Sequence, residues 1–432
     1  MRGDAGRAIA FNGAGVVTQA QFEAEVRGVA AALPDARFAI NLCEDRYRFL
    51  VAFCAVALRG QTTLLPSSRA AAVIDDALAQ HPLSYCIGDA ALDPLPPRFW
   101  PLPAELPRLD GPSPQVERGG CVAIGFTSGS TGQPKPNPKR WAGFEASTAQ
   151  NLAALADLLH APVTPLVATV PPQHMYGMEM SVLLPLLAPF AVHTARPFFP
   201  DDVARALADA PVPPLLVTTP VHLRALVAAQ VVLPRLAGIV SATAPLPVEL
   251  AAAAEARFGC EVRELFGSTE TCVLARRRTA CESAWTPLPG VRLAPQPDGT
   301  AVHAPHLTDP VVLADLVELQ PDGRFILCGR NADLLEIAGK RASLGDLTRK
   351  LLAVPGVEDG VVVQLDDADA AGVRRIAALA VAPGLAPEAI VQAMRMQVDP
   401  VFLPRRLRCV PVLPRNETGK LPRHAVLALL QA

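Results

Sequence analysis

The chain has 432 residues, a formal net charge of −2 and a hydrophobic fraction of 50%. This length exceeds what one ordinary core accommodates, so we expect two or three domains. An apolar half with 19% charged residues excludes a disordered chain. The near-neutral charge gives no indication of a basic surface for nucleic acid, so we expect no nucleic-acid partner. No apolar run reaches the roughly 18 residues that a membrane helix needs, so we expect no integral membrane segment.

Cysteine usage bears on the cellular compartment. The nine cysteines form no C-x-x-C pair and have no regular spacing. Together with the lack of a recognisable signal peptide, this pattern predicts reduced, mostly buried thiols in a cytoplasmic protein.

The first two thirds of the chain alternate predicted helices with apolar segments of strand length. In chain order we predict helices over 19–33 and 44–59, a proline-rich connector over 94–114, a strand over 121–126 and a helix over 143–160. There follow a strand over 163–170, helices over 177–188 and 201–210, a strand over 214–218, a helix over 221–229, a strand over 237–241, a helix over 248–258 and a strand over 261–266. This alternation is typical of doubly wound α/β layers.

Polar loops follow several of the predicted strands. They cover 127–135, 173–177, 241–245 and 267–271. In doubly wound sheets, ligands bind at the carboxyl ends of the strands. The sequence therefore predicts one site built from these loops.

The pattern changes after residue 285. Short β segments with turn signals fill 291–328, followed by a helix over 343–353, strands over 359–365 and 376–382, a helix over 387–397 and a strand near 407–412. We therefore predict a large α/β domain with layered sheets and flanking helices over 1–329, a hinge over 330–333 and a small α+β domain over 334–432.

The stretch FTSGSTGQPKPNPK, residues 126–139, has the composition of an anion site. Glycines permit positive φ, so backbone N–H groups and hydroxyls can turn toward one point, and Lys135 adds positive charge. A Walker-type phosphate loop would need a helix to begin at the lysine. Pro134 and Pro136 flank it and exclude that helix. We predict instead that the prolines direct the chain outward as a mobile loop.

Lysine is scarce in this chain: 5 of the 39 basic residues are Lys, which leaves 34 Arg. A compact ammonium does what a planar guanidinium cannot at a crowded anion. Lys135, Lys340 and Lys420 lie in glycine-containing loops and are the candidates. The ordinary interpretation of each is a solvated loop lysine.

Several motifs, taken together and in order, resemble the acyl-adenylate-forming synthetases, a superfamily that includes acyl-CoA ligases and carrier-protein-loading adenylation enzymes. The matching segments, which extend over most of the chain, are TSGSTGQPK (127–135), SATAPLP (241–247), FGSTE (266–270), ADL (314–316), GRNADLLEIAGKR (329–341) and RNETGKLPR (415–423). The resemblance implies an adenylate-forming enzyme fold with a mobile C-terminal domain, and ATP and Mg²⁺ as cofactors.

The resemblance also implies roles for single residues. Lys420 would bridge the carboxylate and the α-phosphate, Thr269 would bond the α-phosphate, and Glu270 would bind Mg²⁺. The phosphates would contact Thr127, Ser128, Gly129, Ser130, Thr131, Gly132 and Lys135. Adenine and ribose would contact Thr243, Ala244, Pro245, Phe266, Gly267, Asp315 and Arg330. Phe266 stands where relatives often have Tyr, so the ring is kept and a phenol hydrogen bond is lost.

The acid pocket and the second half-reaction are assigned by analogy of position. The pocket candidates are His174, Tyr176, Gly177, Thr219, Ser241 and Cys272; for His174 a packed core histidine is the alternative. Rotation of the C-terminal domain would bring the loop of Gly339, Lys340 and Arg341 to the acyl group. Ala332 stands at the pivot, where many relatives place Asp or Lys, so a charged residue does not stabilise either pose.

The abbreviated N-terminus and the PPQHMYGMEMSVLLPLL run look most like stand-alone ligases of aryl polyene (xanthomonadin-type) pigment clusters. Such enzymes load an aromatic acid, for example 3-hydroxybenzoate, onto an acyl carrier protein. Arginines at 276–278 and 405–408 would then form a basic rim for the carrier, or simply be solvated. The alternatives are an aryl- or medium-chain acyl-CoA ligase that uses free CoA, and a non-catalytic nucleotide-binding sensor or scaffold.

Overall fold

The computed structural model of the protein describes residues 4–66, 68–90, 92–128, 134–296, 299–313, 315–330, 334–337, 340–368, 374–416, 419 and 421–431. Contacts divide the chain into two units. Unit 1 comprises Met1–Val291 with His303–Asp309, and unit 2 comprises Arg292–Val302 with Pro310–Ala432. The hinge over 330–333 stays a prediction, because residues 331–333 lie outside the described part of the chain.

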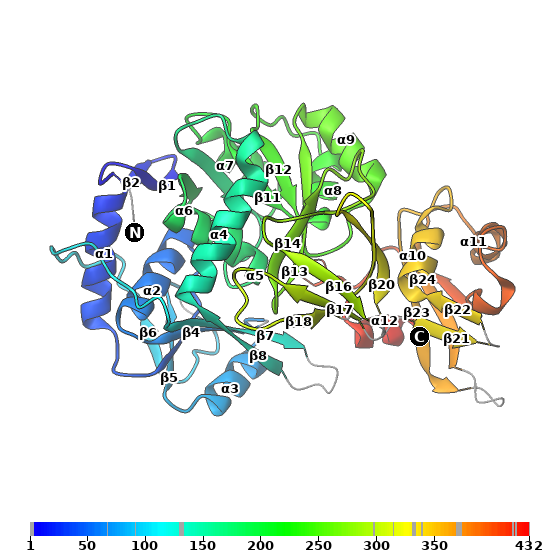
Figure 1. Ribbon diagram of the computed structural model, residues 1–432, viewed down its shortest axis with the longest axis horizontal. Helices are drawn as coiled ribbons and strands as arrows, with labels where there is room; N and C mark the ends of the chain where they lie inside the picture. Colours follow the sequence, from blue (N-terminus) through cyan, green and yellow to red (C-terminus); the bar gives the residue numbers. More distant parts are fainter. Residues whose placement is uncertain are drawn as a thin grey trace. The chain divides into compact units, whose positions relative to one another are not determined.

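Unit 1 contains two sheets, both visible in Figure 1. In the smaller sheet every strand except β8 runs parallel to its neighbour. Its spatial order is β6 (Phe99–Pro101), β5 (Ser84–Gly88), β3 (Phe38–Asn41), β4 (Thr62–Leu65), β7 (Cys121–Ser128) and β8 (Pro134–Arg140). The helices in this part of the chain are α1 (Gln19–Ala32), α2 (Arg46–Leu58) and α3 (Ala71–Gln80).

The larger sheet has a parallel centre with antiparallel strands at both edges. Its spatial order is β15 (Thr286–Pro287), β14 (Cys272–Arg277), β13 (Val262–Ser268), β12 (Gly238–Ser241), β11 (Leu215–Thr218), β9 (Thr164–Ala168), β10 (Phe190–His193), β1 (Ala8–Asn12) and β2 (Gly15–Thr18). The parallel strands are buried, which explains their nearly continuous apolar sequences.

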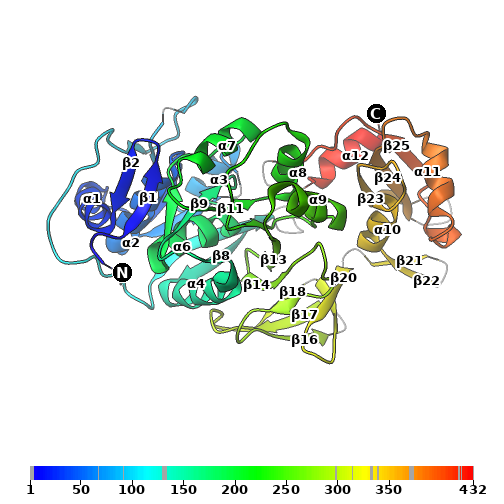
Figure 2. The ribbon, with the colours of Figure 1, turned by 90° about the horizontal axis from the view of Figure 1, so that it is seen from above.

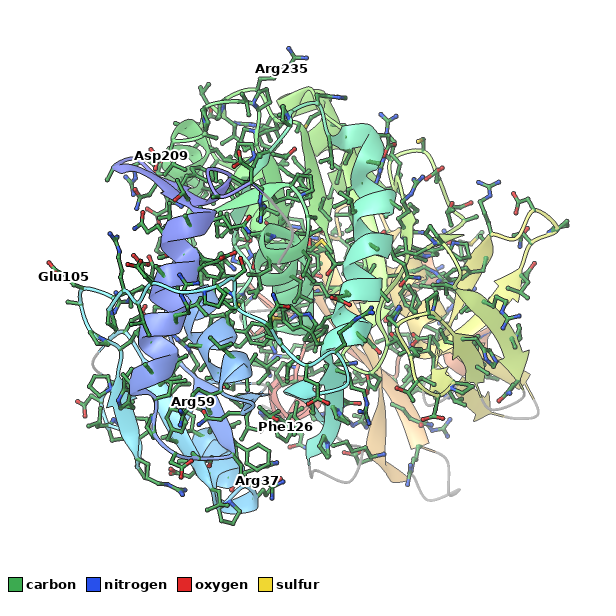
Figure 3. The ribbon with its side chains drawn as sticks, turned by 60° about the vertical axis from the view of Figure 1, so that its left-hand side comes forward. Arg37, Arg59, Glu105, Phe126, Asp209 and Arg235 are labelled. Atoms are coloured by element: carbon green, nitrogen blue, oxygen red, sulfur yellow. The ribbon has the colours of Figure 1, made fainter. Side chains whose placement is uncertain are left out.

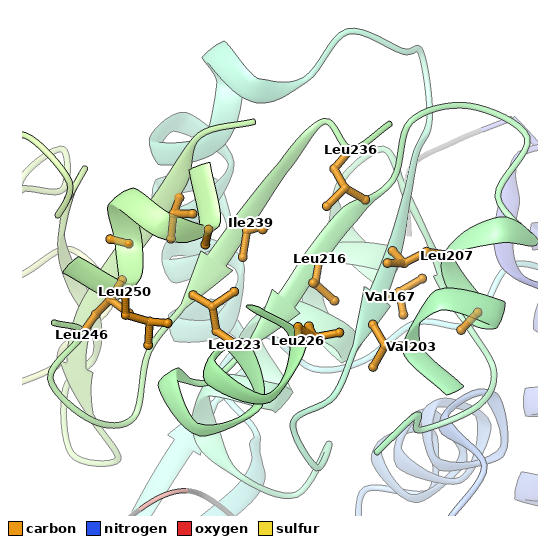
Figure 4. Packing of buried hydrophobic residues seen from close by; sticks show 14 of the residues in the cluster. Val167, Val203, Leu207, Leu216, Leu223, Leu226, Leu236, Ile239, Leu246 and Leu250 are labelled. Carbon is orange, nitrogen blue, oxygen red and sulfur yellow. The ribbon is translucent and has the colours of Figure 1, made fainter. Parts of the chain in front are cut away.

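Helices cover the larger sheet. They are α4 (Trp141–Leu155) with a 3₁₀ turn (Ala156–Leu158), α5 (Met175–Met178), a π turn (Glu179–Leu183), α6 (Leu184–Leu187), α7 (Pro200–Ala208), α8 (Pro220–Ala228) and α9 (Val248–Phe258). Figure 4 shows one packed face, where Leu223 and Leu226 of α8 lie against Leu216 and Ile239 of the strands. The charged side chains labelled in Figure 3 stand at the outer surface instead.

The prediction that residues after Pro134 leave as a mobile loop is wrong. Pro134–Arg140 form β8, paired antiparallel with β7, with Lys135 opposite Thr127. The physical reason is position: β8 is the outermost strand, where proline costs no ladder bond. Prolines 134, 136 and 138 alternate, so their lost N–H groups can all fall on the open edge.

Unit 2 is built from short sheets. They contain β16 (Arg292–Gln296), β17 (Gly299–His303) and β18 (Val311–Leu313); β19 (Asp315–Leu319) and β20 (Phe325–Arg330); β21 (Leu334–Ile337) and β22 (Lys340–Ser343); and β23 (Asp359–Ala368), β24 (Arg374–Val381) and β25 (Arg406–Cys409). The helices are α10 (Leu344–Leu352), α11 (Pro387–Met394), a 3₁₀ turn (Pro400–Phe402) and α12 (Arg423–Gln431).

Side chains of β24 alternate between two cores. Ala378 and Ala380 pack with α10 and α11, whereas Ala377 and Leu379 pack with α12. This period of two places α10 and α12 on opposite faces of the sheet, as Figure 2 shows. Over the described chain, no helix is both long enough and apolar enough to cross a bilayer.

The predicted proline-rich connector is held against α1 by hydrogen bonds and a close backbone contact. Arg27 donates to the carbonyls of Leu109 and Pro112, and a Cβ on Gly28 would lie 2.0 Å from the backbone oxygen of Pro107. Glycine is therefore required at this helical position by a close approach of the backbone.

We predict that Gly28→Ala destabilises the protein by about 1–3 kcal/mol, because the clash displaces the connector. Helix propensity alone would stabilise the variant by about 0.5–1 kcal/mol. Urea unfolding measures the sign. Ala31→Gly, at an exposed position of the same helix, measures helix propensity in isolation. A stabilised Gly28→Ala variant would contradict the predicted clash with the connector.

Candidate functional site

The turn between β13 and β14 presents two polar residues at its tip. Ser268 and Thr271 close the turn: the Ser268 N–H bonds Thr271 Oγ1 at 3.1 Å, and the Thr271 N–H bonds Ser268 Oγ at 3.2 Å. Thr269 and Glu270 lie between them and are partly exposed. Within the described residues, neither side chain makes a hydrogen bond or an ion pair, so both are free to take a ligand.

Three segments meet around Gly125 of β7. A Cβ on this glycine would lie 2.7 Å from Cγ2 of Thr269 and 3.2 Å from Cε of Met175. Any larger residue at position 125 would push the turn away, because the β-branched side chain of Thr269 has few other rotamers to adopt. The hairpin β7–β8, the turn 268–271 and the start of α5 therefore converge, as the loop positions predicted.

Two buried charged residues hold the flanks of the turn, and sequence reasoning missed both. Lys139 donates to the Glu270 carbonyl oxygen at 2.8 Å. Glu179 accepts from the Val273 N–H at 3.0 Å, and also from Ser147 and Asn151 at 3.0 Å each. Burial raises the pKa of Glu179, against these bonds and the charge of Lys139. An acidic residue inside an apolar run, in MYGMEMSVLL, was the available signal.

The segment PPQHMYG places the predicted pocket residues beside the strand ends. His174 caps α5 and accepts the Tyr176 N–H at 3.3 Å through Nδ1. The Tyr176 hydroxyl donates to the Val240 carbonyl at 2.9 Å. A Cβ on Gly177 would lie 2.0 Å from the Pro171 oxygen, so this position needs glycine for packing.

Hydroxyl groups line the carboxyl ends of β9, β11 and β12. Thr169 and Thr218 share a hydrogen bond of 3.0 Å, and Thr218 pairs in register with Ser241. The hydroxyl of Ser241 is buried and has no hydrogen-bond partner among the described residues. Thr219 caps α8 and shares a 2.9 Å hydrogen bond with Nδ1 of His222.

Cys272 lies at the base of the turn with a positive φ of 57°. Burial raises the pKa of its thiol to about 12. The raised pKa favours the protonated thiol at neutral pH, which suits the wall of a pocket.

The predicted adenine-side loop has its own anchors. Thr243 has a φ of 83°, which is uncommon for a non-glycine residue and recurs at active sites and ligand-binding segments. Ala244 and Pro245 follow, and the Leu246 N–H bonds Glu264 at 2.9 Å. Phe266 packs beside Trp285 with ring centroids 5.5 Å apart. A Cβ on Gly267 would lie 2.1 Å from the Cys272 oxygen, so the hairpin itself requires this glycine.

Part of the predicted phosphate loop lies outside the described residues. These positions are Gly129, Ser130, Thr131 and Gly132. Thr127 and Ser128 end β7, and Lys135 is exposed on β8.

Unit 2 contains the other predicted residues. Asp315 and Arg330 are paired across β19 and β20, so the backbone places the two predicted ribose contacts opposite each other. Lys340 and Arg341 begin β22, whereas Ala332, Gly339 and Lys420 lie outside the described residues.

The segment before Lys420 is anchored within unit 2. Arg415 pairs with both oxygens of Asp359 at 2.7 and 3.0 Å and donates to the Gly419 carbonyl at 2.8 Å. The bidentate pair therefore fixes the carbonyl that directly precedes the predicted catalytic lysine.

Magnesium fits the turn as a ligand shared with substrate. The described residues contain no cluster of three or more His, Cys, Asp or Glu that would cage a metal ion. Mg²⁺ usually takes one or two protein carboxylates and completes its shell with phosphate oxygens and water. The carboxylate of Glu270, which has no hydrogen-bond or ion-pair partner among the described residues, matches that mode.

Comparisons with known proteins agree with this architecture. The family described as AMP-binding enzyme matches residues 70–303. The 4-coumarate–CoA ligase of Rhodobacter capsulatus is 34% identical over 242 residues, which cover 55% of this chain and 59% of that protein. The 4-coumarate–CoA ligase of Halorhodospira halophila is 30% identical over 323 residues, which cover 68% of this chain and 73% of that protein.

A solved structure shares the fold over the whole chain. ATP-bound MatB from Rhodopseudomonas palustris matches with a TM-score of 0.84 and 18% identity, covering 100% of this chain and 96% of that one. The predicted fold class, a large N-terminal α/β part and a smaller C-terminal part rich in strands, is confirmed.

His222 gives the protein a dependence on pH. Burial lowers the pKa of this imidazole from 6.5 to about 4, so its contribution to stability is complete above pH 6.5 and is lost as the pH falls toward 4. We predict that the wild type loses about 2 kcal/mol more than His222→Gln between pH 7.5 and 5. Urea unfolding at both pH values measures this difference.

The exposed His160 supplies the control, since His160→Gln should follow the wild type. A His222→Gln variant with the same pH dependence as the wild type would contradict the burial argument.

Proposed function

The chain belongs to the AMP-binding enzyme family, and we propose that it is an AMP-forming acid–thiol ligase. It joins a carboxylic acid to AMP, releases pyrophosphate and passes the acyl group to a thiol. The observation that carries the proposal is the convergence at Gly125 of the β7–β8 hairpin, the turn bearing Thr269 and Glu270, and the start of α5.

The first half-reaction must bring two anions together. A carboxylate oxygen attacks the α-phosphorus of ATP, and the bond to the β-phosphate oxygen breaks as pyrophosphate leaves. Lys135 on β8 supplies positive charge, and the Thr269 hydroxyl, which has no partner within the described part of the chain, supplies a donor. Glu270 would hold Mg²⁺, which neutralises phosphate charge when bound. We assign the bridging ammonium to Lys420, as the resemblance implies.

The second half-reaction forms a thioester. The sulfur of a thiolate attacks the acyl carbonyl, and the bond to AMP breaks. We propose that unit 2 turns about residues 330–333 between the two steps and presents the loop of Gly339, Lys340 and Arg341. A glycine at 339 would allow close approach of the backbone.

We propose an aromatic acid of the hydroxybenzoate or hydroxycinnamate class as the substrate. Two relatives are named for 4-coumarate, which is a phenolic acid. The buried Ser241 hydroxyl, with no partner among the described residues, and the α5 cap His174 are groups suited to recognising a ring hydroxyl.

The acceptor is a phosphopantetheine thiol, which CoA and carrier proteins share. The two 4-coumarate relatives are named as CoA ligases, which favours CoA. The predicted basic rim for a carrier gives less support, because Arg278 pairs with Glu255 at 2.8 Å, and Arg406 and Arg408 donate to carbonyls at the end of α12.

We predict that pyrophosphate release in the presence of ATP and Mg²⁺ depends on an added aromatic acid. A coupled pyrophosphate assay over a panel of benzoates, cinnamates and medium-chain acids measures the dependence. A non-catalytic scaffold would release none with any acid. Adding CoA or a phosphopantetheinylated carrier protein to separate reactions then identifies the acceptor by mass spectrometry of the thioester.

We predict that Lys420→Ala lowers the adenylation rate at least about a hundredfold, which corresponds to about 3–4 kcal/mol of lost charge stabilisation. The variant should still transfer the acyl group from a supplied acyl-adenylate. Lys350→Ala, on α10 of the same unit, should adenylate at the wild-type rate. Adenylation by Lys420→Ala at that rate would remove Lys420 from the mechanism.

A further inference from the structure

Lys139 is a buried ammonium committed to one loop. The residue is 9% exposed, and its ammonium donates to the Glu270 carbonyl at 2.8 Å. Burying a charge is costly unless it gains compensating bonds. Among the described residues, Lys139 forms no ion pair within 4 Å, and its hydrogen bond is to the backbone of the turn.

The turn is held by charges of opposite sign that match its backbone dipoles. The ammonium of Lys139 donates to the Glu270 carbonyl, before Cys272 in the chain. The carboxylate of Glu179 accepts the Val273 N–H, after it. Hydrogen bonds to charged groups are shorter and stronger than neutral ones. Between these two bonds, Cys272 is held in the left-handed region with a φ of 57°.

Lys139 also connects the turn to the phosphate-binding hairpin. It lies on β8 opposite Ala123, four residues after Lys135. Residues i and i+4 of a strand face the same side, so the two lysines share one face of β8. The strand that presents Lys135 to phosphate is therefore the strand that fixes the position of Glu270.

We propose that Lys139 is a positioning residue that orients Glu270 for Mg²⁺ by fixing its carbonyl group. This inference rests on the proposed function, because it takes Glu270 as the carboxylate that binds the metal ion. Without the ammonium, the 270–271 peptide can rotate. The Glu270 carboxylate is then still present but is no longer oriented toward the metal ion. Lys139 thus acts on the metal-dependent part of nucleotide binding.

The test compares nucleotide affinity with and without metal. Titration calorimetry measures the Kd of ATP in excess Mg²⁺ and in EDTA for the wild type and for Lys139→Met. We expect the Mg²⁺-dependent Kd to rise about tenfold or more in the variant, the range seen when support of a metal ligand is lost. The Kd in EDTA should change less than about threefold. Equal changes in both Kd values would show a general structural role and overturn the proposal.

The neighbouring cation supplies a matched control. Arg140, on the same strand, donates to the Gly119 carbonyl and is exposed. Arg140→Met should bind MgATP as the wild type does. Lys139→Gln keeps a donor without the charge and should lie between the wild type and Lys139→Met; it also supplies the comparison if Lys139→Met does not fold in thermal unfolding.

A double-mutant cycle separates positioning from an independent effect. Glu270→Gln should lose the Mg²⁺-dependent affinity, and adding Lys139→Met should cost little more, because both changes act through one carboxylate. Additive losses would contradict the proposal. The calorimetric result does not depend on catalysis. If no acid supports pyrophosphate release, the proposed reaction is wrong. If Lys139→Met binds MgATP with the wild-type Kd, only the proposed role of Lys139 is wrong.

Discussion

The close approach of β7 to the turn between β13 and β14 is the constraint on which the site depends. At Gly125 the missing Cβ leaves room for Thr269, whose methyl group would lie 2.7 Å from it. This contact joins the smaller sheet to the larger one at the carboxyl ends of their parallel strands. The hairpin proposed to bind phosphate and the turn proposed to bind the metal ion can then serve one nucleotide.

Such an approach between irregular segments has to be stabilised by groups other than a regular hydrogen-bond ladder. Within the turn, Ser268 and Thr271 hydrogen-bond each other's backbone N–H groups. On its flanks, Lys139 bonds a backbone carbonyl and Glu179 bonds a backbone N–H. A π turn places Glu179 inside an otherwise apolar layer. Interruptions of this kind in helices often occur at functional sites. Here the interruption provides the carboxylate that bonds the turn.

The sequence predicts the parallel layers well because their signal is local. Helix α9 over 248–258 and the strands β11 and β12 are apolar runs of ordinary length between clear turn residues. The short strands β3 and β4 were missed, because four residues carry too little periodicity to identify a strand. Strand β8 was read as a loop, since proline content excludes a central strand and the edge position is set by the tertiary structure.

The candidate site divides in the same way. The motif FGSTE predicts roles for Thr269 and Glu270, because the chemistry of such roles is carried by the residues themselves. The roles of Lys139, Glu179 and Gly125 follow from contacts between segments that are far apart in the sequence, 131 residues in the case of Lys139 and Glu270. A lysine next to an arginine on an edge strand looks like a solvated charge until the partner sheet is placed against it.

This difference has a chemical reason. The groups that meet the nucleotide must suit phosphate, so their identities recur as motifs, whereas the groups that aim them need only reach a backbone carbonyl or N–H. An ammonium on β8, a carboxylate on a π turn and an absent Cβ on β7 each control the position of the turn by a different physical means. The same logic holds in unit 2, where Arg415 bonds Asp359 and the Gly419 carbonyl and so fixes the chain beside Lys420. In the proposed reaction, the residues that contact substrate and the residues that aim them are thus separate sets, joined through the backbone.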